Sequence, residues 1–82
     1  MELCKIYIDN KIMMNKNIKK KFAKNIKKLR KQKRLSQEAL SLELDLDGSY
    51  IGKIENAKLN ITLDKIILIA DYFNVAVKDL FE

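Results

Sequence analysis

Ser49 and Lys53 lie four residues apart, so a helix would present a hydroxyl and an ammonium on one face, as partners for phosphate or base edges. Gln37 follows Ser36, a typical helix-capping residue, and a helix start with free N–H groups attracts anions. The sequence has no histidine, no glycine-rich phosphate loop and no nucleophile beside a base. We therefore expect binding chemistry, no enzyme activity, and no metal or other cofactor.

Two short helices joined by an acute turn are predicted around these side chains. Ser36 opens an apolar-periodic run that includes Leu40, and Asp47 opens a second run in which Ile51 and Ile54 face inward. This is the layout of a helix-turn-helix, in which the first helix supports the second and leaves one face of it exposed. The second helix is expected over residues 47–56, and its outward positions are Gly48, Ser49, Gly52, Lys53 and Asn56.

Three further helices complete the expected fold, an all-α, compact five-helix bundle. Apolar residues recur at helical spacing over 17–33, over 62–73 after the capping Thr62, and over the short final segment 75–82. On the fourth helix, Leu68 and Tyr72 fall on the side opposite the core. The core stripe expected on that helix is Leu63, Ile66, Ile67, Ala70 and Phe73.

The sequence resembles the phage repressor/Cro helix-turn-helix family, and within it the controller proteins of restriction-modification systems. The matching residues are Ser36, Gln37, Glu38, Leu40, Leu46, Asp47, Ser49, Tyr50, Ile51, Ile54 and Glu55, followed by Asn60 to Leu63 and Asp79 to Phe81. The resemblance covers residues 18–82. It implies a sequence-specific double-stranded DNA-binding transcriptional regulator that acts as a homodimer on a pseudo-palindromic operator.

The resemblance also implies roles for single residues. Gln37 is expected to lie against phosphate, and Tyr50 against phosphate or the minor-groove edge. Arg30 and Glu55 are expected to form a structural ion pair that ties the first helix to the end of the reading helix. Two reading-helix residues at outward positions are the expected base-edge contacts, Ser49 and Lys53. The full predicted DNA-contacting set is Gln37, Gly48, Ser49, Tyr50, Gly52, Lys53, Asn56, Lys58 and Asn60.

Several residues depart from the pattern of this family. Asp45 stands in the turn where glycine is usual, at a position that calls for positive φ, and Ser41 replaces a buried alanine. Gly48 and Leu59 occupy positions that are often basic in controller proteins, and Gly52 removes another side chain from the reading surface. Because of these losses we expect either modest specificity or heavy reliance on DNA shape. A second hypothesis is a protein-interaction module that keeps only the helix-turn-helix shell.

A homodimer is the expected assembly, and its interface is expected at the C-terminal end, as is common in this family. The final segment is either interface or core material. The predicted interface residues are Leu68, Tyr72, Val77, Leu80 and Phe81. RNA polymerase is a further candidate partner, because a regulator bound near a promoter blocks or recruits it. A phage or mobile-element repressor and an antitoxin remain alternative identities.

The charge of the chain is unevenly distributed. Residues 1–34 hold 11 Lys and 2 Arg against 2 acidic residues, whereas residues 35–82 hold 4 Lys against 9 acidic residues, within a total of +6. A polyanion is the natural partner of the first half, and a basic helix on membrane or RNA ranks last among the readings. We expect a poorly ordered or strand-like extension over 1–16 and one DNA-binding domain over 17–82. The single Cys4 and the lack of an apolar span predict a cytoplasmic protein.

Overall fold

The computed structural model describes residues 15–58 and 61–82. The expectations for residues 1–14, Leu59 and Asn60 lie outside this part of the chain. Of the predicted extension, Asn15 and Lys16 belong to the start of a helix. The elements of the described residues are α2 (Lys16–Gln32), α3 (Gln37–Glu43), α4 (Tyr50–Glu55), α5 (Leu63–Phe73) and η1 (Val77–Phe81).

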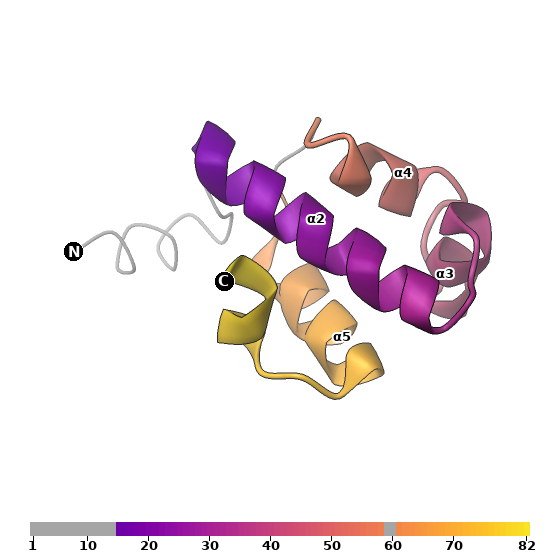
Figure 1. The fold of residues 1–82 in the computed structure, drawn as a ribbon. Helices are drawn as coiled ribbons and strands as arrows, with labels where there is room; N and C mark the ends of the chain where they lie inside the picture. Colours follow the sequence, from indigo (N-terminus) through magenta and orange to yellow (C-terminus); the bar gives the residue numbers. More distant parts are fainter. Residues whose placement is uncertain (1–14, 59–60) are drawn as a thin grey trace.

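The prediction of an all-helical fold is confirmed for these residues, but the count of five helices needs correction. Four of the elements are α-helices, and the last one, η1, is a 3-10 helix. Ala76 before it is extended, and the turn is closed by a bond from the Asp79 N–H to the Ala76 carbonyl (3.0 Å). Figure 1 shows α2 running across the molecule, with α3 and α4 to one side of it and α5 and η1 to the other.

Side-chain caps start three of the α-helices, as the sequence pattern predicts for two of them. Asn15, Ser36 and Thr62 each accept a hydrogen bond from the N–H three residues ahead. A left-handed residue follows each of the four α-helices, and none of these residues is glycine. They are Arg34 (φ 58), Asp45 (φ 58), Ala57 (φ 56) and Asn74 (φ 56). Asp45 thus adopts the positive φ expected of it, whereas neither glycine does.

The core lies where α2 packs against both halves of the molecule. Its apolar members are Phe22, Ile26, Leu40, Leu44, Ile51, Ile54, Ile61, Ile66, Ile69, Ala70 and Leu80. Asn25 holds α2 to the C-terminal end of the chain, because its amide donates to the carbonyls of Leu80 (2.9 Å) and Glu82 (3.0 Å).

The predicted core stripe of α5 was wrong by part of a turn. Ile69 is fully buried, whereas Ile67, which was assigned to the core, is 41% exposed. Apolar residues occupy every position of α5 from Ile66 to Ala70, so helical periodicity alone does not decide which face turns inward. Ile67 therefore joins Leu68, which is 38% exposed, on the outer surface of α5.

Ser41 connects α3 to α4 from a fully buried position. Its hydroxyl donates to the Gln37 carbonyl (2.9 Å) and accepts from the N–H of Ile51 (3.0 Å), which belongs to the first turn of α4. No α-helix can satisfy that N–H internally, because the N–H groups of the first turn lack a partner four residues back. The replacement of the usual alanine by Ser41 therefore supplies a hydrogen bond between the two helices.

Replacing Ser41 with alanine is expected to lower the free energy of unfolding by about 1 to 3 kcal/mol, because the Ile51 N–H stays buried without an acceptor. Urea denaturation followed by circular dichroism measures this difference. Ser36→Ala serves as a comparison, since it removes an exposed hydroxyl acceptor at the start of the same helix. A Ser41→Ala variant as stable as the wild type would show that the buried N–H needs no partner.

Candidate nucleic-acid interface

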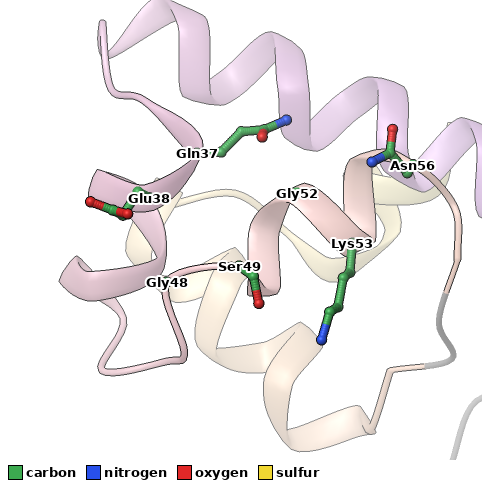
Figure 2. A pocket seen from close by; sticks show the side chains of 7 residues that line it. All are labelled: Gln37, Glu38, Gly48, Ser49, Gly52, Lys53 and Asn56. Carbon is green, nitrogen blue, oxygen red and sulfur yellow. The ribbon is translucent and has the colours of Figure 1, made fainter.

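A groove of about 550 Å³ lies between the start of α3 and the outward face of α4. Figure 2 shows the side chains around it, with Ser49 and Lys53 projecting from the same side of α4. Its lining residues are Gln37, Glu38, Gly48, Ser49, Gly52, Lys53 and Asn56. The structure thus brings together six residues of the predicted DNA-contacting set. Glu38 was missed, although its place one residue after Gln37 in the first turn of α3 was a signal.

The helix α4 begins at Tyr50, three residues later than predicted. Residues 47–49 form a turn instead, in which the Asp47 carboxylate accepts from the Ser49 N–H (2.9 Å) and from the Ser49 hydroxyl (2.6 Å). The bond from that hydroxyl, aided by the N–H, holds the pKa of Asp47 below its usual value. Since a hydroxyl has one donor, Ser49 has only its acceptor lone pairs left for another partner.

An ion pair holds the far end of α4 to α2. The Arg30 guanidinium donates to both carboxylate oxygens of Glu55, from Nε to Oε2 (2.6 Å) and from Nη2 to Oε1 (3.0 Å), and its Nη1 donates to the Leu35 carbonyl (2.8 Å). The hydrogen bond with Glu55 raises the pKa of Arg30, so the guanidinium stays charged. The side chains are 11% and 3% exposed, which gives this pair a structural position rather than a surface one.

Gln37 is attached to the same ion pair. Its amide nitrogen donates to Glu55 Oε1 at 3.0 Å, although the residue as a whole is exposed. The resemblance to the repressor family implies only a phosphate contact for Gln37. The structure shows that one of its two amide hydrogens already has a partner within the chain, and that the other remains for a further acceptor.

Two further predicted contacts, Tyr50 and Lys58, are not among the residues that line this groove. Tyr50 is half-buried and packs against the core, and burial raises its pKa. Lys58 is exposed just beyond the left-handed Ala57, and its N–H donates to the Lys53 carbonyl at 3.1 Å. Neither residue lines the groove, so each would reach a ligand only from its edge.

A second groove, of about 480 Å³, runs along α2 beside the end of α4. Lys20, Lys24 and Lys27 line it at helical spacing, and the buried Ala23 forms part of its wall. Its acidic wall residue, Glu55, is already paired with a guanidinium. Asn56 lines both grooves, which makes them neighbours on one surface. These three lysines therefore line a groove beside α4, whereas the other lysines of α2 do not.

The predicted interface residues of η1 are partly internal. Leu80 is fully buried in the core of its own chain, so the core alternative holds for it and it offers no surface to a partner. Phe81 stacks on Phe22, with ring centroids 5.1 Å apart, and Val77 is half-buried against the same core. The reason is that η1 folds back onto α2.

On α5, Leu68 and Tyr72 differ in what they contact. Leu68 is exposed, whereas the Tyr72 hydroxyl donates to Glu43 Oε1 (3.2 Å) and the Lys33 ammonium lies 4.9 Å from the centre of its ring. Burial, with the hydrogen bond to Glu43, raises the pKa of Tyr72. Tyr72 therefore already links α5 to α3 within one chain.

Residues 15–58 and 61–82 contain neither a group of side chains suited to a metal ion nor a membrane-spanning helix. No three His, Cys, Asp or Glu side chains gather there in a way that could hold a metal ion. In the same part of the chain, every helix is too short or too polar to cross a membrane.

Comparison with known proteins agrees with this geometry. Residues 26–80 match the sequence model of a family described as helix-turn-helix, and the chain belongs to that family. Its relatives include control proteins, as the resemblance predicted. Control protein C.MunI from Mycoplasma sp is 39% identical over 66 residues, which are 79% of this chain and 89% of that protein.

Solved structures of restriction-modification controller proteins share the fold. C.AhdI from Aeromonas hydrophila superposes with a TM-score of 0.70 at 35% identity, over 77% of this chain and 96% of that one. C.Esp1396I, solved as a tetramer in complex with its natural 35 base-pair operator, gives a TM-score of 0.66 at 33% identity, over 78% of this chain and 84% of that one.

Proposed function

We propose that this protein is a restriction-modification control protein, a sequence-specific double-stranded DNA-binding regulator of transcription that acts as a homodimer on a pseudo-palindromic operator. The observation that carries the proposal is the groove of polar side chains on the uncovered face of α4. A known controller of the same fold binds its operator. Under this proposal the chain is a cytoplasmic regulator rather than an enzyme. Residues 17–82 are its DNA-binding domain.

The two grooves contact different parts of the DNA: the groove on α4 contacts bases, and the groove along α2 contacts phosphates. Ser49 and Lys53 face the bases from the outward side of α4, because the start of the reading helix enters the major groove in such domains. Lys53 suits acceptors on guanine, whereas Ser49, whose proton is engaged by Asp47, suits the amino groups of adenine or cytosine. The lysines along α2 face the phosphate backbone next to the reading helix, where they supply affinity without reading sequence.

A homodimer places two reading helices about 34 Å apart, one turn of DNA. We assign the contact between the copies to the outer face of α5, where Ile67 and Leu68 are exposed together, with Tyr72, Val77 and Phe81 at its margin. Selection of bound sites from random duplexes tests the proposal as a whole. We expect a motif with two-fold symmetry; enrichment of no motif at low salt would refute DNA reading.

The protein-interaction module remains the second candidate, because Gly48 and Gly52 leave the groove with fewer side chains for reading bases. Salt dependence separates the two. Binding that neutralises phosphates weakens steeply with salt, with a log-log slope of about −0.9 for each contact, whereas an apolar protein contact changes little.

Removing the three charges of the α2 groove with Lys20→Gln, Lys24→Gln and Lys27→Gln is expected to flatten the log-log salt slope of operator binding by about 2.7 per half-site, or about 0.9 for each contact. Fluorescence anisotropy over a series of salt concentrations measures the slope. The matched control removes three other exposed lysines that line neither groove, Lys21, Lys28 and Lys78. Equal slopes for the two variants would show that the salt dependence follows the net charge of the protein and not phosphate contacts in this groove.

A further inference from the structure

Gly52 sits in the middle of α4, where glycine is a poor choice for the helix itself. Its φ is not positive, so the backbone does not require glycine at this position. Glycine destabilises a helix interior relative to alanine, because the unfolded chain gains more freedom from it. An explanation for Gly52 must therefore come from the space that its missing side chain leaves.

That space is occupied by Gln37. A Cβ atom at position 52 would lie 3.1 Å from Gln37 Oε1 and 3.7 Å from Gln37 Cδ. The first distance is closer than about nine in ten real Cβ contacts, so the amide of Gln37 would have to shift by a few tenths of an ångström. In Figure 2 the Gln37 side chain reaches from α3 over α4 just above Gly52.

The opposite end of the Gln37 amide is held by Glu55. The amide nitrogen donates to Glu55 Oε1 at 3.0 Å, and the ionised carboxylate only accepts, which sets which end of the amide faces it. Glu55 is itself held by two hydrogen bonds from Arg30, and its side chain is almost fully buried. An exposed glutamine is thereby connected to a carboxylate that the ion pair with Arg30 already holds.

We propose that Glu55 and Gly52 are positioning residues, which hold the Gln37 amide in one orientation before DNA binds. Glu55 accepts its amide hydrogen, and Gly52 leaves room for its oxygen. The second amide hydrogen then faces outward at the wall of the α3–α4 groove, where a phosphate oxygen of the DNA accepts it. This inference rests on the proposed DNA-binding function. Its physical basis is that a long side chain ordered in advance loses less rotamer freedom on binding.

Gly52→Ala is therefore expected to change stability and DNA binding in opposite directions. The melting temperature of the free protein should rise by about 2 to 8 °C, since alanine favours the helix and the exposed Gln37 side chain can swing away. Affinity for the selected operator should fall about three- to tenfold, which corresponds to the ordering of one long side chain. A variant that is both more stable and a weaker binder cannot be explained by misfolding.

A double-mutant cycle with Gln37→Ala assigns the loss to Gln37. In the Gln37→Ala background, Gly52→Ala should change operator affinity by less than about twofold, because no side chain remains to be displaced. The matched control is Gly48→Ala, on the same groove. Its Cβ would meet Glu38 Cγ at 3.4 Å, an ordinary contact, so its effect should be the same with and without Gln37.

Three results would overturn the inference. One is unchanged affinity for Gly52→Ala, and another is an equal loss in both backgrounds, which would mean that the methyl group itself meets the DNA. The third needs no DNA: an unshifted side-chain amide resonance of Gln37 in the NMR spectrum of free Gly52→Ala would show that the amide never lay over Gly52. If instead the wild type binds no duplex while that resonance does shift, the proposed function fails and the intramolecular contact stands.

Discussion

Arg30→Ala is expected to lower the free energy of unfolding by about 3 to 5 kcal/mol, because it leaves the carboxylate of Glu55 buried without a cation. The guanidinium also donates to the Leu35 carbonyl, which closes the loop between α2 and α3, so that bond is lost as well. Native proteins are stable by only about 5 to 15 kcal/mol, so this substitution should remove a large fraction of the free energy of unfolding. Urea denaturation at neutral pH measures the loss.

Two further variants separate charge from geometry. Arg30→Ala combined with Glu55→Ala should be more stable than Arg30→Ala alone, because no unpaired charge remains. Arg30→Lys should fall between the wild type and Arg30→Ala, since an ammonium cannot donate in parallel to both oxygens as the guanidinium does. A loss below about 1 kcal/mol for Arg30→Ala, the value usual for surface pairs, would contradict the buried position of this pair.

Ile67→Glu combined with Leu68→Glu is expected to convert the dimer into monomers and to weaken binding to a full operator by about 10² to 10⁴-fold. The two introduced carboxylates of each copy would face those of the other across an apolar contact, and the two half-sites would no longer be held by one assembly. Sedimentation measures the assembly, and titration against full and half operators measures the affinity. Binding to an isolated half-site should stay unchanged, which shows that the reading surface is intact.

Tyr72 is left untouched in this test, because its contacts with Glu43 and Lys33 would confuse loss of the interface with loss of a contact inside one chain. Leu42→Glu is a single-charge control: it places one glutamate on another exposed leucine, 59% accessible, on α3. It should leave the assembly unchanged. A dimer that persists in the double variant of α5 would move the interface to another face.

Much of the fold could be predicted, since its signals act between residues close in the chain. The cap at Ser36, the positive φ at Asp45 and the inward Ile51 and Ile54 all lie where the sequence pattern places them. The first helix begins at Lys16, within one residue of its predicted start. Most of the groove was also predicted, because successive outward positions of one short helix necessarily share a surface.

Other features required the packed chain. The rotation of α5 that buries Ile69 and exposes Ile67 depends on which neighbours the helix meets, and an apolar helix offers several faces to them. The buried hydroxyl of Ser41 gains its meaning only from Ile51, ten residues away, and Gln37 only from Glu55 and Gly52. Local spacing thus determined where α2, α3 and α5 start and which side α4 turns outward, because hydrogen bonds within a helix span four residues. Tertiary packing alone decided which side chains meet across helices, since those contacts depend on how whole helices are placed against one another.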